Sequence, residues 1–359
     1  MASSSMAQMI GDVVVGVDTH DAIHVAAAFG TEVGQRLGHL EIPTNPQGYR
    51  QLLSWARSRG AKVTFGIEGT GSYGAGLAQF LRDAECVVLE VSRPNRQTRR
   101  LRGKSDPIDA EAAARAVLSG EATGIAKAND NRVGMIRSLR LARRSAVRMR
   151  TQTSNQMRAL VITGPSDLRE RLRGLPIADL VAVSSALRPG TVTTPTAATK
   201  LALRGLGLRH QMLGAELATL DVELSRLTQE VAPELCALQG VGTDVAGALL
   251  VAAGDNPERL RSEAAFAKLC GAAPMEASSG KTTRHRLSRS GDRVANNALW
   301  RVVMVRLAWH APTRAYAARR TAEGLSKQEV IRCLKRYVAR QVFHALPNRN
   351  PPCWPLDKA

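Results

Sequence analysis

The stretch Gly66-Ile-Glu68-Gly-Thr-Gly-Ser-Tyr73 decides the fold of the first third of the chain. The apolar run from Val63 to Ile67 predicts a short buried strand that ends where Glu68 stands. The Gly-Thr-Gly-Ser that follows predicts a tight turn, and the apolar spacing of the next residues predicts a helix over 74–83. An acid at the carboxyl end of a strand faces the crevice in which open α/β sheets bind ligands. Glu68 is therefore a candidate functional residue.

Two further acidic segments, one on each side of this stretch, predict a metal site. Asp18 ends the apolar run Val13–Val17 as Glu68 ends its own strand. Asp106 and Asp109 are three residues apart, so on a helix they project from one face. Hard cations prefer carboxylate oxygens, and two-metal sites clamp the oxygens of a phosphoryl displacement. The four acids therefore predict a site for Mg²⁺ or Mn²⁺, whereas the alternative for the Asp pair is a helix start, with Asp106 as N-cap.

The order of elements over residues 10–125 predicts an α/β domain. Strands are expected at 13–17, 23–29, 37–42, 63–67 and 87–91, and helices after Asn45-Pro46, at 74–83 and at 107–118. Three early strands followed by alternating helix and strand is the order of a ribonuclease-H-like fold.

Charge indicates the kind of partner. The 359 residues include 50 Lys and Arg against 31 Asp and Glu, a net charge of +19, which implies a polyanion and most simply nucleic acid. Aromatic residues make up only 4%, too few for base stacking to be the main binding mode. The five cysteines are scattered without a CxxC pair, which disfavours zinc and disulfide frameworks and fits a reducing cytoplasm. We expect neither a signal peptide nor a membrane span.

Three basic segments are candidate nucleic-acid contacts. They are a loop at 93–104 before the Asp pair, a long Arg-rich helix within 132–173 that breaks at Gly164-Pro165, and a polar loop at 278–291. A solvated charged loop is the alternative for the first, but like charges on one helix face are expected to need a polyanion. The candidate residues are Arg96, Arg99, Arg100, Arg102, Lys104, Arg137, Arg140, Arg144, Arg148, Lys281, Arg284 and Arg286.

Residues 130–232 are predicted to form a basic helical region with a coiled coil. After a Pro- and Thr-rich linker at 188–195, leucines recur every seven residues from Leu206 to Leu227, and further leucines fill the alternate seam position. This seam can pair with the Arg-rich helix of the same chain or with another protomer. His210 interrupts the seam, and we expect it to be structural.

Residues 233–346 are predicted to form a mostly α-helical domain, with helices at 293–309 and 327–346, followed by a disordered tail at 347–359. The segment Leu238-Gln-Gly240-Val-Gly242 resembles a helix-hairpin-helix turn, whose N–H groups can bind a phosphate where the next helix begins. An ordinary tight connection is the alternative.

The loop Ser278-Ser279-Gly280 carries a second possible chemistry. A serine beside glycine and several cations can reach a phosphodiester whose charge those cations neutralise. A sequence of this kind is nevertheless usually only a loop.

Taken in order, these motifs resemble one family. Val-Gly-Val-Asp18, Gly-Ile-Glu68-Gly-Thr-Gly-Ser-Tyr and Gly-Lys-Ser-Asp106-Pro-Ile-Asp109-Ala resemble the Asp-Glu-Asp-Asp domain of the IS110 insertion-sequence transposases, relatives of the Piv-type invertases. Leu-Gln-Gly-Val-Gly, Phe-Ala-Lys-Leu-Cys-Gly-Ala-Ala-Pro and the Ser-Ser-Gly loop through Gly291 resemble that family's C-terminal transposase domain. The resemblance covers about residues 12 to 345.

The resemblance implies a RuvC-like catalytic domain that binds Mg²⁺ or Mn²⁺ through the four acids. It also implies a serine that becomes covalently joined to DNA, which by motif position is Ser279, with Ser278 as the fallback. Implied partners are donor and target DNA, a guide (bridge) RNA encoded by the element, and further copies of the chain, as a dimer or tetramer whose active site combines domains of different protomers. A bacterial, nucleoid-associated cytoplasmic protein would fit.

One departure concerns the segment after Gly291. The family tends to carry a basic Leu-Arg pair there, whereas this chain has Ala295-Asn-Asn-Ala-Leu299. We therefore expect a local DNA contact to differ.

The sequence thus predicts an RNA-guided, metal-dependent DNA recombinase with a serine nucleophile. One alternative is a RuvC-like, structure-selective nuclease in which water attacks and no covalent intermediate forms. The other is a non-catalytic nucleic-acid-binding protein whose acids only cap helices. A protein–DNA adduct would separate the first two, and dependence on divalent metal would exclude the third.

Overall fold

The computed structural model describes residues 12–91, 105–128, 131–278, 285–286, 288 and 291–347. The chain divides into two compact units, Met1–Asn131 with Ala253–Arg261 and Arg132–Ala252 with Ser262–Ala359. Each unit is described by itself.

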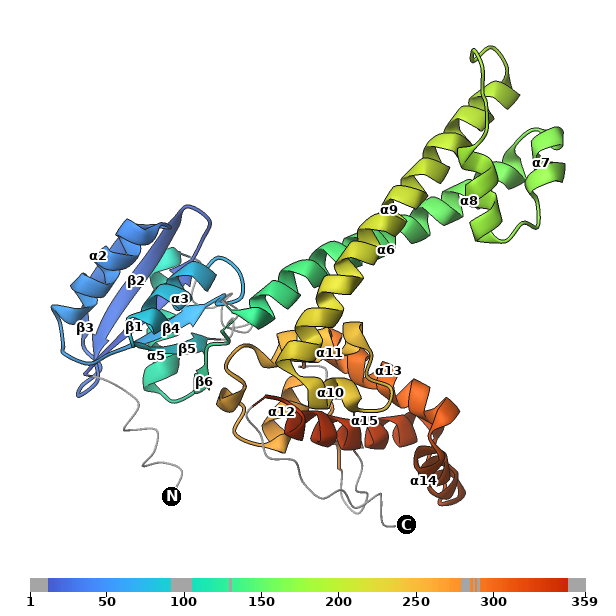
Figure 1. Ribbon diagram of the computed structural model, residues 1–359. Helices are drawn as coiled ribbons and strands as arrows, with labels where there is room; N and C mark the ends of the chain where they lie inside the picture. Colours follow the sequence, from blue (N-terminus) through green and yellow to red (C-terminus); the bar gives the residue numbers. More distant parts are fainter. Residues whose placement is uncertain are drawn as a thin grey trace. The chain divides into compact units, whose positions relative to one another are not determined.

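The first unit is built on a six-stranded mixed sheet in the order β3-β2-β1-β4-β5-β6 (Figure 1). The strands are β1 (Val13–Thr19), β2 (Ile23–Gly30), β3 (Arg36–Pro43), β4 (Val63–Glu68), β5 (Val87–Val91) and β6 (Gly124–Ile125). β4 is parallel to both β1 and β5, and the other neighbours are antiparallel. The five predicted strands are confirmed, and the mixed sheet is consistent with a ribonuclease-H-like domain. The two-residue β6 was not predicted, because it is too short to show a period.

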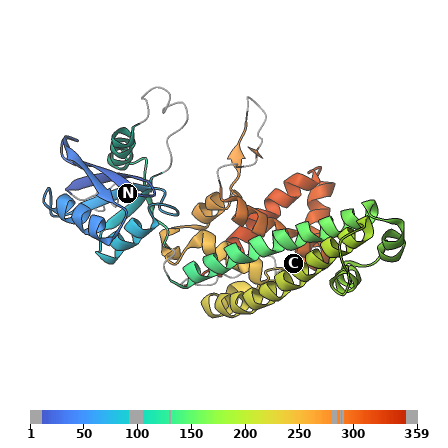
Figure 2. The same cartoon turned by 90° about the horizontal axis from the view of Figure 1, so that it is seen from above.

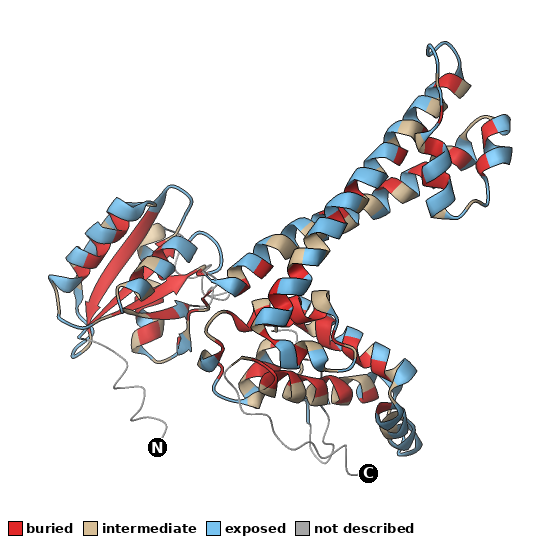
Figure 3. Ribbon diagram, in the orientation of Figure 1, coloured by how far each residue is buried: buried red, intermediate tan, exposed pale blue. Residues whose placement is uncertain are grey.

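Helices cover both faces of this sheet. α2 (Pro46–Arg57) and α3 (Ala75–Asp83) pack on the face formed by the odd-numbered residues of β1 and β4, whereas α5 (Asp106–Leu118) packs on the opposite face. Strands buried from two sides read as continuous apolar runs, as β1 and β2 do (Figure 3).

The contact between α5 and the sheet is unusually close, because glycine stands where the helix crosses two strands. A Cβ on Gly16 would lie 2.1 Å from the carbonyl oxygen of Ala110 and 2.2 Å from the backbone nitrogen of Ala114. Gly66, which pairs with Gly16 in the parallel register, would carry a Cβ 2.6 Å from Cγ2 of Val117. The absence of two side chains therefore sets how near α5 lies to β1 and β4.

Side-chain caps fix where several helices begin. The Asn45 side chain accepts a hydrogen bond of 2.9 Å from the Gly48 N–H, which confirms the predicted start of α2. Ser326 and Glu329 form a capping box at α15 (Lys327–His344).

The second unit begins with a pair of long helices. α6 (Arg132–Thr163) and α9 (Pro195–Val231) lie side by side and antiparallel in both views (Figures 1 and 2). α7 (Ser166–Leu172) and α8 (Ile177–Ser185) connect them, and α7 starts after the predicted break at Gly164-Pro165. The leucine seam of α9 packs against α6 of the same chain, and its buried members include Leu203, Leu213, Leu217, Leu224 and Leu227. The intrachain alternative for the seam is thereby confirmed.

The rest of the second unit is mostly helical. It contains α10 (Pro233–Ala237), α11 (Thr243–Ala253), α12 (Glu263–Leu269), α13 (Arg293–Trp309), α14 (Ala311–Ala322), α15 and a hairpin of β7 (Met275–Glu276) and β8 (His285–Arg286). A 3-10 turn, η1 (Pro257–Arg259), belongs to the first unit. The predicted helices at 293–309 and 327–346 are confirmed, the latter ending at His344. The tail predicted at 347–359 lies, after residue 347, outside the described residues.

Membrane-spanning helices and the state of the cysteines can be assessed for the described residues. None of their helices is both long and apolar enough to cross a membrane. Cys86, Cys236, Cys270 and Cys333 are free thiols.

We predict that Gly16→Ala will lower the free energy of unfolding by about 3 kcal/mol, because the added methyl group would force α5 away from the sheet. Urea denaturation followed by circular dichroism measures this change. Gly124→Ala is the matched control, since a Cβ there would meet no atom within 4 Å. Equal stability of the two variants would contradict the close contact of α5 with β1.

Candidate functional site

The carboxyl ends of β1 and β4 bring two acids together. Val17 pairs with Ile67 in the parallel register, and Asp18 and Glu68 each follow by one residue. They share the face of Gly16, which is the face that α5 covers. Both side chains are buried, with 8% of Asp18 and 7% of Glu68 exposed. The predicted meeting of two strand-end acids is therefore present.

The first turn of α5 supplies the other two acids. The helix begins at Asp106, whose side chain is about half exposed, and Asp109 is buried one turn further on. The interpretation of Asp106 as N-cap is wrong, because Ser105 holds that position and makes no side-chain capping bond. The charges of Asp106 and Asp109 both act on Asp18, which places the Asp pair beside this strand-end acid.

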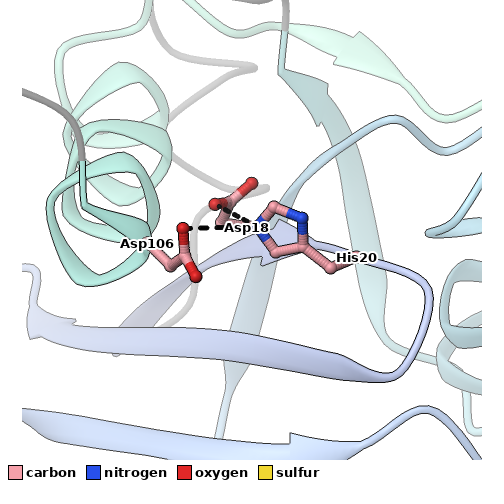
Figure 4. Close-up of side chains that lie close together, drawn as sticks. All are labelled: Asp18, His20 and Asp106. Atoms are coloured by element: carbon pink, nitrogen blue, oxygen red, sulfur yellow. Dashed lines mark hydrogen bonds and ion pairs between the residues drawn. The ribbon is translucent and has the colours of Figure 1, made fainter.

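His20 joins this cluster and was missed in the sequence. Its Nε2 lies 3.1 Å from Oδ2 of Asp18 and 3.4 Å from Oδ1 of Asp106, so the imidazole bridges the strand end and the helix start (Figure 4). Asp18, His20 and Asp106 place one ligand atom each within 4.8 Å of one another. The alternation of side chains along a strand could have indicated it, because in an extended chain the residue two positions after Asp18 points to the same face.

Electrostatics show that the cluster fits a cation. Burial raises the pKa of Asp18 above its usual value of 3.8, His20 opposes this, and the nearby Asp109 and Asp106 raise the pKa further. Among the described residues, no lysine or arginine forms an ion pair with these three aspartates. A bound divalent cation would relieve the repulsion among them, and their oxygen atoms are the ligands that Mg²⁺ prefers.

A hydrogen bond ties the two strand ends together. Oγ1 of Thr19 donates to the carbonyl oxygen of Glu68 at 2.8 Å, across the gap between β1 and β4. Gly69, directly after Glu68, has φ +72°, a left-handed conformation that glycine adopts without strain. The Gly-rich stretch therefore turns the chain away immediately and leaves the acids at the sheet edge.

The basic loop before the Asp pair and most of the serine loop fall outside the described residues. Arg96, Arg99, Arg100, Arg102, Lys104, Ser279, Gly280, Lys281 and Arg284 lie outside the described residues. Ser278 and Arg286 are described, and both are exposed.

The Arg-rich face of α6 divides into two groups. Arg140 donates to Oδ1 of Asp244 at 3.1 Å, and Arg143 donates to Asp221 on α9. Arg137, Arg144 and Arg148 are exposed. Part of the positive charge thus holds the second unit together, and Arg144 and Arg148 are exposed to solvent. Contact with nucleic acid stays a prediction for all of these residues.

The predicted Gly-Val-Gly turn lies between α10 and α11. Gly240 has φ +84°, and a Cβ there would approach the carbonyl oxygen of Val302 to 3.3 Å, so this glycine lets the turn pack on α13. Gly242 is exposed, with no atom within 4 Å of a Cβ. In the first turn of α11, Asp244 pairs with Arg140 and Arg301. The phosphate contact predicted for this turn stays a prediction.

Comparison with known families identifies the chain. A family model described as "Transposase", of the Asp-Glu-Asp-Asp type, matches residues 15–163, and one described as "Transposase IS116/IS110/IS902 family" matches residues 232–318. The chain is thus a transposase, an enzyme that cleaves DNA and transfers strands. More narrowly, the chain belongs to the IS110 family. No curated protein matches it.

The two matches cover different candidate functional segments of the chain. The first spans all four acids, His20 and the Arg-rich helix, and the second spans the Gly-Val-Gly turn and the Ser-Ser-Gly loop. The acidic cluster, within a domain of this type, indicates dependence on a divalent metal ion.

We predict that Asp18→Asn will raise the melting temperature of the metal-free protein at pH 7. The folded state binds the Asp18 proton more tightly than the unfolded state, so this group favours folding most below about pH 3.8 and loses that contribution as the pH rises through its raised pKa. Removing the charge removes that penalty. Thermal denaturation measures the difference, which should shrink as the pH is lowered.

Saturating Mg²⁺ should reverse the order of the two melting temperatures, because the variant lacks one carboxylate ligand and binds the ion more weakly than the wild type. A lower melting temperature for metal-free Asp18→Asn at pH 7 would contradict the assignment of Asp18 as a destabilised, buried charge.

Proposed function

We propose that this transposase is the RNA-guided recombinase of an insertion sequence, which joins donor and target DNA through a serine nucleophile. The observation that supports the metal-dependent part is the closeness of Asp18, His20 and Asp106, with Asp109 acting on Asp18 and Glu68 at the end of the adjacent strand. The serine and the guide RNA rest on the resemblance of the sequence motifs to the IS110 family.

The acids and His20 would position a divalent cation, Mg²⁺ or Mn²⁺. When bound, such an ion neutralises charge on the phosphodiester oxygens. Asp18 and Glu68 stand on rigid strand ends, and Asp106 and Asp109 stand on a helix held directly against those strands. Asp18, Glu68 and Asp109 are also buried, which restricts their side chains as a site needs to hold a ligand in one geometry.

Ser279 is the proposed nucleophile, with Ser278 as the fallback. Its hydroxyl would lose a proton and attack phosphorus, the bond from phosphorus to one deoxyribose oxygen would break, and that oxygen would leave as a hydroxyl. A hydroxyl of the second DNA strand would then attack the serine phosphodiester and release the serine. Cations of the same loop would neutralise the phosphate charge during both steps.

The partners follow from this proposal. Donor and target DNA would be paired with a guide RNA of the element, and a dimer or tetramer would supply the two domains of each active site from different protomers. The exposed arginines of α6, including Arg144 and Arg148, would contact phosphates of these nucleic acids.

The experiment is plasmid recombination with the element's non-coding RNA supplied. We predict that Ser279→Ala and Glu68→Ala will each abolish strand exchange while leaving DNA and RNA affinity within about twofold, because both act on the chemical step. Chelation of divalent metal should abolish exchange by the wild type. A protein–DNA adduct should appear in denaturing gels of the wild type and be absent from Ser279→Ala.

Ser278→Ala is the matched control and should stay active. Exchange by Ser279→Ala with loss only in Glu68→Ala would contradict the serine mechanism and indicate a metal nuclease in which water attacks. Activity without divalent metal would contradict the role of the acids.

A further inference from the structure

A pocket in the second unit lies outside the acidic site. It has a volume of about 920 Å³ and is enclosed by the loop Gly271–Pro274, strand β8, and helices α14 and α15. β8 pairs with β7, and Arg286 lies opposite Met275 in that hairpin. Met275 is three residues before Ser278 in the sequence. The pocket therefore opens beside the segment that leads into the serine loop. Figure 2 shows this short orange hairpin projecting from the helices.

The lining of the pocket is strongly cationic. Its basic side chains are Arg286, Arg319, Arg320, Arg332, Lys335 and Arg336. Glu329 is the acid among the described lining residues, and it lies 3.6 Å from Arg332. Just outside, Glu323 pairs with both Arg319 and Arg320. Two acids thus neutralise part of the charge and leave a clear positive excess.

The positive excess includes one buried side chain and two partly buried ones. Lys335 is only 6% exposed, and its Nζ donates to the amide oxygen of Asn296 at 3.0 Å, a partner that carries no charge. Nη1 of Arg336 and Nε of Arg320 are buried without a hydrogen-bond acceptor among the described residues. Burying donors without acceptors is unfavourable, so these groups favour an added anion.

The charges of these groups repel one another in the unliganded pocket. Burial lowers the pKa of Lys335, and the nearby Arg332 lowers it further. Burial also lowers the pKa of Arg336, Arg340 adds to this, and Glu263 partly opposes it. A bound anion would favour the charged form of both side chains.

We infer that this pocket binds a phosphodiester group of the DNA strand that reaches the serine loop. Arginine presents a planar fork of donors that matches phosphate oxygens, and several surround the pocket. Tyr316 and Tyr337 lie edge to face at 5.5 Å on the same wall and offer an apolar surface to the adjoining sugar or base. The inference rests on the transposase activity of the family and does not require the guide RNA or the serine nucleophile.

Anisotropy of a labelled single-stranded DNA oligonucleotide, measured over a salt series, tests the pocket. Arg336→Gln should weaken binding about tenfold and reduce the slope of log affinity against log salt by about 0.7, the loss of one phosphate contact on a single strand. Arg286→Gln should also weaken DNA binding and reduce the salt slope. Because Arg286 lies on the exposed hairpin, misfolding of the core would not explain this loss. Arg314→Gln is the matched control on α14, since Arg314 is exposed and outside the pocket.

Inorganic phosphate provides a second readout. It should raise the melting temperature of the wild type and of Arg314→Gln, but raise that of Arg336→Gln markedly less, because that variant loses a pocket donor, Nη1 of Arg336, that has no acceptor among the described residues. Unchanged DNA affinity in both Arg336→Gln and Arg286→Gln, or an equal loss in the control, would overturn the inference. A loss confined to RNA oligonucleotides of the same length would also overturn it and assign the pocket to RNA.

Strand exchange separates this inference from the proposed function. If the wild type fails to recombine but the variants change DNA binding as expected, the recombinase proposal fails and the pocket stands. If the wild type recombines and the variants bind and recombine normally, the pocket inference fails and the recombinase stands.

Discussion

The first unit depends on the backbone contact of α5 with β1 and β4. Gly16 and Gly66 pair across the two strands, and at each of them a Cβ would collide with α5. This contact fixes the height of the helix above the sheet and therefore the position of its first turn. Asp106 consequently lies close to Asp18 and His20 at the carboxyl edge of the strands, and the charge of Asp109 also acts on Asp18. The acidic site is thus a consequence of how closely two layers can pack.

Both units accumulate buried charge of one sign, and this connects stability to function. In the first unit, burial and neighbouring carboxylates raise the pKa of Asp18. In the second, Lys335 is buried and Arg336 is partly buried, and burial lowers the pKa of each. Each cluster destabilises the unliganded protein and favours a ligand of opposite charge. A divalent cation and a phosphodiester are the two charged components of one strand-transfer reaction, so the two clusters are suited to the same substrate.

Local patterns in the sequence predict the helices and strands. The features that these patterns do not predict depend on contacts between distant parts of the chain. Apolar runs, the Asn45 cap and the leucine heptad predict the five main strands, α2 and α9, because each signal lies within one element. The four acids are predicted by their places at strand ends and a helix start. His20 was missed because its role depends on Asp106, which is 86 positions further along the chain. The pairing of Arg140 with Asp244 likewise joins residues 104 positions apart, and no local sequence pattern predicts it. The closeness of α5 at Gly16 also requires the sheet register.

The central claim is that the four acids form a metal site at the edge of the sheet. Anomalous X-ray diffraction from crystals soaked in Mn²⁺ tests it most directly, because the ion is located independently of activity. The account predicts a manganese peak at about 2.1–2.2 Å from carboxylate oxygens of Asp18 and Asp106, with Glu68 or Asp109 in the same shell, and its loss in Glu68→Gln. A peak elsewhere with none at these acids, or an unchanged peak in Glu68→Gln, would contradict the account.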